Sequence, residues 1–166
     1  MNKVLTITER NNVLTTMAEL ILKEKEAIIK ENQKDLDAYN GGDLAMEDRL
    51  KVDQEKIQVM ITSLNELAEK EDPLGKERFH FQHENGMHVY NKTAPFGTVM
   101  IIYESRPDVT VEAAGIAFKS GNKIVLKGGK ESINSNLKIV ELWDRALKQH
   151  GITEKWVEYL KFDRKQ

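Results

Sequence analysis

Residues 95–135 place an alanine-rich helical pattern between two short apolar runs, and this alternation constrains the fold more than any other feature. The runs at 99–103 and 123–127 have the length and continuous apolar character of strands covered on both faces of a parallel sheet. The segment 107–120 begins with proline and is followed by Gly-Asn, which are common helix start and stop signals. Strand, crossover helix and strand together predict an α/β fold.

A second helical pattern at 134–149 and a third strand at 156–160 extend this unit to βαβαβ. Such a unit is half of a doubly wound, Rossmann-like parallel sheet, which is normally built from two halves. A parallel sheet needs helices on both faces, and the chain offers only these two helices and the N-terminal ones. We therefore expect the front part of a larger domain, with an exposed sheet edge after the last strand.

The N-terminal part of the chain is predicted to be helical. Apolar residues recur at spacings of three, four and seven along 8–39, and a second amphipathic pattern covers 53–71. Thr8 and Asp53 are the expected N-caps of these two segments. The first segment is long, so a single helix and a pair broken near residues 24–26 are both compatible with it.

Residues 78–92 are predicted to form a β-hairpin, because Asn-Gly at their centre is the strongest short hairpin signal. Both arms are polar, so the hairpin should pack against something other than its own core. His80, His83 and His88 lie near one another on it, and histidine is a common zinc ligand. We favour a solvated hairpin, since the odd separation of His80 and His83 directs them to opposite faces of a regular strand.

The composition is that of an ordinary globular chain. A length of 166 residues with 40% hydrophobic and 31% charged residues allows a real core and argues against disorder. A formal net charge of −2 gives no electrostatic reason to expect nucleic acid or an anionic membrane as partner. Zero cysteines exclude disulfides and cysteine-based metal sites, and suit an intracellular protein. We expect a cytoplasmic protein with neither signal peptide nor membrane span.

Two turns are the candidate binding positions, because ligands of open α/β sheets bind beyond the carboxyl ends of the strands. The first turn holds Ser105 and Arg106 before a helix N-terminus, where free N–H groups favour anions. Arg106 adds a bidentate donor for phosphate or carboxylate. A turn whose arginine is merely exposed is the alternative reading.

The second turn is glycine-rich. Gly128 and Gly129 would let a ligand approach the backbone, with Lys127 and Lys130 on either side. The spacing matches neither the Walker A loop nor the Gly-x-Gly-x-x-Gly fingerprint. A glycine-rich turn between strand and helix is also common for steric reasons alone.

Several segments match one enzyme family in their amino-acid sequence. They are residues 94–99, 102–111, 119–122 and 127–131, with 31–36 and 48–50 in the N-terminal part. Together they resemble the γ-glutamyl phosphate reductase (glutamate-5-semialdehyde dehydrogenase) branch of the aldehyde dehydrogenase superfamily. Most aldehyde dehydrogenases carry a Trp-Asn-Phe-Pro-like turn where this chain has Glu-Ser-Arg-Pro at 104–107. The resemblance covers essentially the whole chain.

The resemblance implies NADPH-dependent reduction of L-glutamyl 5-phosphate to L-glutamate 5-semialdehyde and phosphate, a step of L-proline biosynthesis. The backbone of Ile102, Tyr103, Glu104 and Ser105 would then line the nicotinamide side of the cofactor. Ser105 would stand where relatives have an asparagine that holds the oxyanion, and its hydroxyl can donate one such hydrogen bond. Arg106, peculiar to this branch, is assigned to the anionic substrate or the leaving phosphate.

On the adenosine side, Lys127 matches a lysine that contacts the ribose, and Gly128 and Gly129 lie beside it. Lys130 stands where NAD-preferring relatives often carry a glutamate that grips the ribose hydroxyls. A cation at this position attracts a 2′-phosphate that a carboxylate would repel. The resemblance therefore implies NADP rather than NAD.

The family's chemistry needs a cysteine thiolate, and the chain has none, so we expect no catalytic residue in it and no activity from it alone. The resemblance implies an N-terminal portion of the reductase, divided into a helical segment (1–76), a hairpin of the oligomerisation region (77–94) and an incomplete NADP-binding domain (95–166). It also implies a homo-oligomer formed through the hairpin, with glutamate 5-kinase as a candidate partner. The alternative is a stand-alone, non-catalytic binding or assembly module derived from the same fold.

Overall fold

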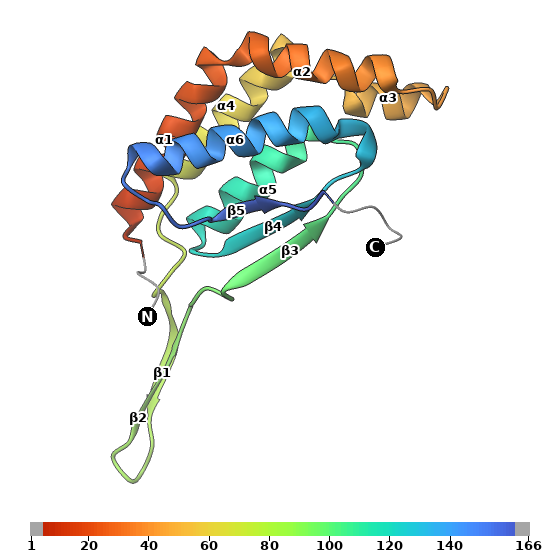
Figure 1. The fold of residues 1–166 in the computed structure, drawn as a ribbon. Coiled ribbons are helices and arrows are strands. Elements are labelled where there is room, and N and C mark those ends of the chain that lie inside the picture. Colours follow the sequence, from red (N-terminus) through yellow and green to blue (C-terminus); the bar gives the residue numbers. More distant parts are fainter. Residues whose placement is uncertain (1–4, 162–166) are drawn as a thin grey trace.

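A computed structural model describes residues 5–161, and in it a small parallel sheet lies beneath a layer of helices while a hairpin projects from the body (Figure 1). The sheet contains three strands in the order β3 (Thr98–Ile102), β4 (Lys123–Lys127) and β5 (Val157–Tyr159). All pairings in it are parallel. This arrangement confirms the predicted βαβαβ unit.

The crossovers of the sheet are α5 (Pro107–Lys119) and α6 (Ile133–Gln149), and a short 3-10 helix, η1 (Lys130–Ser132), precedes α6. The described residues cover only one face of the sheet. Met100 and Ile102 on the other face of β3 are 52% and 74% exposed. A continuous apolar run indicates that both faces of a strand can be buried, but it does not indicate which part of the protein covers each face.

The predicted helical stretch 8–39 is two helices, α1 (Ile7–Lys23) and α2 (Lys25–Ala38), with Glu24 between them. The N-cap of α1 is Thr6, so the prediction of Thr8 was wrong. The Thr6 hydroxyl accepts the Glu9 amide at 3.2 Å, and the Glu9 carboxylate accepts the Thr6 amide at 2.7 Å. A reciprocal capping box needs a glutamate or glutamine three residues after the N-cap, and no such residue stands three positions after Thr8.

Asp53 is the N-cap of the helix α4 (Gln54–Glu69), as predicted, and its carboxylate accepts the Lys56 amide at 3.0 Å. Between α2 and α4 lies a helix that the sequence did not indicate, α3 (Leu44–Leu50). Only Leu50 of α3 is buried, so no apolar stripe marks it.

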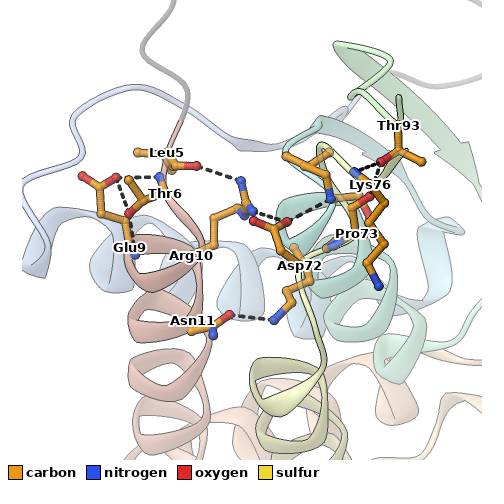
Figure 2. A network of polar contacts seen from close by, with 12 residues as sticks. Leu5, Thr6, Glu9, Arg10, Asn11, Asp72, Pro73, Lys76 and Thr93 are labelled. Atoms are coloured by element: carbon orange, nitrogen blue, oxygen red, sulfur yellow. Dashed lines mark hydrogen bonds and ion pairs between the residues drawn. The ribbon is translucent and has the colours of Figure 1, made fainter. Parts of the chain in front are cut away.

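The hairpin consists of β1 (Glu77–Gln82) and β2 (His88–Lys92), paired antiparallel as predicted. Every residue of β1 is exposed. The base of the hairpin is fastened by Thr93, whose hydroxyl donates to the Pro73 carbonyl at 2.7 Å and accepts the Lys76 amide at 2.9 Å (Figure 2).

One hydrophobic core joins the N-terminal helices to the sheet, since α1 and α4 pack on each other and on α5, and α1 also packs on α6. Polar contacts reinforce this junction (Figure 2). Arg10, 1% exposed, donates to the Asp72 carboxylate at 2.6 Å and to the Leu5 carbonyl at 2.7 Å. The division at residues 76 and 94 stays a prediction.

No helix within residues 5–161 is both long and apolar enough to cross a membrane.

Candidate functional site

The carboxyl ends of β3 and β4 lie at the same level, because Ile102 pairs with Lys127 in the register of the two strands. The turns that follow the strands enclose an open cavity of about 670 Å³. Its walls are Met46, Ile102, Tyr103, Glu104, Ser105, Lys127, Gly128, Gly129, Lys130 and Glu131. Every residue predicted from the sequence to lie beside a cofactor is in this set, and the structure brings them together around one cavity.

Ser105 is turned inward at the end of β3 and is only 1% exposed. Its hydroxyl donates to the Glu131 carboxylate at 3.0 Å, which bridges the turn after β3 to the turn after β4. A hydroxyl has one proton to donate, and here that proton is directed at Glu131. Donation to an oxyanion would require the Ser105 hydroxyl to leave this partner.

Arg106 does not line the cavity. It occupies the N-cap position of α5 without a side-chain capping bond, and its guanidinium donates to the Asp108 carboxylate at 2.8 Å. The hydrogen bond and the charge of Asp108 raise the pKa of Arg106 further above its ordinary value. The side chain is about half exposed, at 52%, so an anion can reach it from solvent.

The two glycines form the floor of the cavity because a larger residue would collide with the groups behind it. A Cβ atom on Gly128 would lie 2.5 Å from the Asn136 side-chain nitrogen, and one on Gly129 would lie 2.7 Å from the Glu131 carboxylate. Both distances are well inside van der Waals contact. Asn136 is fully buried, so glycine is required for packing at position 128, whereas the Glu131 carboxylate near Gly129 is the end of a flexible side chain. Both glycines leave the backbone open to the cavity.

The charges around the cavity are balanced. Lys127 and Lys130 contribute two cations, and Glu104 and Glu131 contribute two carboxylates. Glu104 lies 3.9 Å from the guanidinium of Arg49, a loose ion pair between exposed side chains. An anionic ligand would therefore meet attraction on the lysine side and repulsion near the two glutamates.

Sequence reasoning missed two of the cavity residues. Met46 comes from α3, the helix that carries no apolar periodicity, and Glu131 lies directly after the predicted lysine. The resemblance at 48–50 was a signal that this part of the chain matters. No pattern in the sequence indicated that α3 folds over the ends of β3 and β4.

The histidines of the hairpin are engaged locally. The His80 ring lies 3.0 Å from the Glu77 carboxylate and stacks on Tyr90, which also stacks on His88. Among residues 5–161, no cluster of three His, Cys, Asp or Glu side chains is arranged to hold a metal ion.

Known proteins are similar to this chain in both sequence and fold. The sequence profile described as "Aldehyde dehydrogenase family" matches residues 2–160. A gamma-glutamyl phosphate reductase from Clostridium perfringens (strain 13 / Type A) is 40% identical over 154 residues, which are 92% of this chain and 37% of the relative. The chain thus spans well under half the length of that relative.

Solved structures agree with this match. The crystal structure of a gamma-glutamyl phosphate reductase from Thermotoga maritima superposes with a TM-score of 0.91 at 34% identity, covering 97% of this chain and 40% of that chain. A succinic semialdehyde dehydrogenase from Streptococcus pyogenes, solved with NADP+, has a TM-score of 0.70 at 18% identity, with 96% and 32% covered. At that identity the second likeness concerns the fold alone.

Proposed function

This chain belongs to the aldehyde dehydrogenase family, and on that premise we propose that it is the N-terminal part of an NADPH-dependent reductase that converts L-glutamyl 5-phosphate to L-glutamate 5-semialdehyde and phosphate. The observation that carries the proposal is the cavity at the ends of β3 and β4, lined by the residues that the resemblance assigns to the cofactor. The match to curated gamma-glutamyl phosphate reductases supports the choice of substrate. We place this reaction in cytoplasmic L-proline biosynthesis.

The cavity fits a dinucleotide in its chemistry. The glycine floor at Gly128 and Gly129 offers backbone that a side chain would otherwise cover, and Lys127 and Lys130 offer cations for ribose and phosphate oxygens. Ile102 and Met46 add apolar surface to the cavity lining. When bound, NADPH would supply the hydride that reduces the acyl group.

The chain's own residues would bind and orient. Lys130, exposed at the rim, would attract the 2′-phosphate and so favour NADP over NAD. Arg106 would exchange Asp108 for the phosphate of the substrate, since both are oxyanions that match the guanidinium fork. Ser105 would donate to the oxyanion once its hydroxyl no longer donates to the Glu131 carboxylate.

The nucleophile of the proposed reaction is not among these residues, because the chain contains no cysteine. The same fact favours the second candidate function, a non-catalytic binding or assembly module. The exposed hairpin suits either function as a surface for pairing two copies of the chain. Glutamate 5-kinase, which makes the proposed substrate, is the corresponding candidate partner.

The deciding experiment uses the protein expressed from its complete reading frame. Oxidation of NADPH that depends on L-glutamyl 5-phosphate, with one phosphate released per NADPH, is the expected result. The 166-residue chain made alone should bind NADPH in a calorimetric titration without turning it over. A complete frame that encodes no cysteine and shows no such oxidation would favour the binding module.

A further inference from the structure

A buried series of hydrogen bonds runs beneath the glycine floor of the cavity. It begins at the hydroxyl of Tyr103, at the end of β3, which lies 2.6 Å from the hydroxyl of Thr110 on α5. Thr110 donates to the side-chain oxygen of Asn136 on α6 at 2.7 Å. Thr110 and Asn136 are both fully buried, at 0% exposure.

The direction of these bonds follows from their protons. Thr110 gives its single hydroxyl proton to Asn136, so Tyr103 must be the donor to Thr110. Burial raises the pKa of Tyr103 and thus keeps its hydroxyl protonated for this role.

The series continues through the amide nitrogen of Asn136. This nitrogen donates to the Ser132 hydroxyl at 2.9 Å and to the Tyr159 hydroxyl at 3.2 Å. Ser132 in turn donates to the backbone carbonyl of Gly129 at 3.3 Å. The donors therefore point in one direction, from the wall at Tyr103 to the floor at Gly129.

Asn136 is also in direct packing contact with the floor. A Cβ on Gly128 would lie 2.5 Å from its nitrogen and 2.9 Å from the Tyr159 hydroxyl. The Asn136 amide uses its oxygen and both of its N–H hydrogens in this fully buried place. It cannot shift without leaving a buried polar group unpaired, so its position fixes how deep the floor lies.

We propose that Asn136 is a positioning residue that sets the Gly128–Gly129 floor for the cofactor, and that Thr110 links this floor to the Tyr103 wall. Neither Thr110 nor Asn136 lines the cavity, so both act through the residues that do. The inference rests on the proposed function, because the ligand whose binding it governs is NADPH.

The test compares two changes at Thr110 in the protein expressed from its complete reading frame. Thr110→Val keeps the shape and removes the hydroxyl, whereas Thr110→Ser keeps the hydroxyl. We expect Thr110→Val to weaken NADPH binding about tenfold and to raise the KM for NADPH similarly, while kcat stays within about twofold. Thr110→Ser should restore NADPH affinity to within about twofold of the wild type.

A matched control comes from the apolar side of α6. Ile139 is fully buried and outside the series, so Ile139→Val should lower the melting temperature by about 1–6 °C and leave NADPH affinity unchanged. Ser132→Ala removes the last two bonds of the series, from Asn136 to Ser132 and from Ser132 to Gly129, and keeps the test open if Thr110→Val does not fold. It should weaken NADPH binding in the same direction.

The outcomes separate the two claims. If Thr110→Val and Ser132→Ala lower the melting temperature as Ile139→Val does but leave NADPH affinity within about twofold, the series is only structural and the inference is wrong. If the wild-type protein itself binds no NADPH, the proposed function fails, and the inference falls with it.

Discussion

The carboxylate of Asp35 on α2 accepts both the backbone amide and the hydroxyl of Ser135, at 2.8 and 2.6 Å, and so ties α2 to the start of α6. The same carboxylate accepts the backbone and side-chain N–H groups of Asn134, at 3.0 and 2.8 Å. A negative charge at a helix N-terminus also interacts favourably with the helix dipole. The start of α6, directly after the cavity turn, is thus held by a residue about a hundred positions earlier in the chain.

Replacing Asp35 should therefore be costly. Asp35→Ala leaves buried donors of α6 without a partner, and we expect a loss of about 2–3 kcal/mol in the free energy of unfolding. Asp35→Asn, which retains one acceptor oxygen, should cost about half as much. Urea unfolding measures both, with Asp37→Ala on the exposed face of the same helix as control, expected within about 0.5 kcal/mol of wild type. Equal losses at the two aspartates would contradict this account.

Lys130 should decide the choice of cofactor. In the protein expressed from its complete reading frame, Lys130→Glu places a carboxylate where the 2′-phosphate is proposed to bind. It should shift the ratio of kcat/KM values for NADPH and NADH by about tenfold or more toward NADH. Lys130→Gln, which removes the charge without reversing it, should give an intermediate ratio. A ratio that is the same in all three proteins would show that this lysine does not meet the phosphate.

Arg106 should act on the substrate rather than on the cofactor. Arg106→Ala is expected to raise the KM for L-glutamyl 5-phosphate about tenfold or more and to leave the KM for NADPH within about twofold. Arg106→Lys keeps the charge and loses the planar fork, so its KM should lie between the two. The assignment fails if Arg106→Ala leaves the KM for L-glutamyl 5-phosphate unchanged.

The N-cap of α4 should make stability depend on pH. The hydrogen bond from the Lys56 amide is the main cause that lowers the pKa of Asp53 below its ordinary value of 3.8. Because the folded-state pKa is the lower one, the stabilisation is complete above that ordinary value and is lost as the pH falls through the depressed pKa. Asp53→Ala should cost about 1 kcal/mol at neutral pH.

This pH dependence can be tested by measuring the free energy of unfolding at a series of acidic pH values. The difference between wild type and Asp53→Asn, which caps but does not titrate in this range, should shrink as the pH drops below 3.8. A constant difference would mean that the carboxylate is not the titrating cap.

The ion pair of Arg10 and Asp72 should matter far more than an exposed pair. Arg10 is 1% exposed, so Arg10→Ala removes the cation beside the Asp72 carboxylate, takes a donor from the Leu5 carbonyl and creates a void, at a cost of about 3 kcal/mol. Within residues 5–161, the Asp72 carboxylate then keeps only its hydrogen bond from the Leu74 amide, at 2.9 Å. The exposed pair of Lys34 and Glu31 is the comparison, and Lys34→Ala should cost less than about 0.5 kcal/mol. Thermal and urea unfolding of the two variants measure both losses in the free energy of unfolding.

The sheet and the cavity were predictable because the rules that govern them are local. Apolar runs marked β3 and β4, and the carboxyl ends of neighbouring parallel strands meet at one edge. That geometry predicts that Ser105 and Lys127 lie close together, and both line the cavity. The Asn-Gly turn located the hairpin in the same way.

What could not be predicted depends on partners that are distant in the sequence. The inward turn of Ser105 is fixed by Glu131, and α3 is held mainly by Leu50 and by contacts with α2. The error at Thr8 was of another kind, since the spacing from Thr6 to Glu9 is the local signature of a capping box. The continuous apolar run of β3 did not show that one of its faces is left open by the described residues.

The hairpin divides the chain into two pieces that share a single core. Its tip at residues 83–87 is exposed and touches no other element, so a protease should cut there first. One product would hold α1 and α4, and the other would hold α5, α6 and the sheet. Because these elements pack on one another, the products should stay associated after the cut. The fold should then be recoverable by mixing two separately synthesised halves.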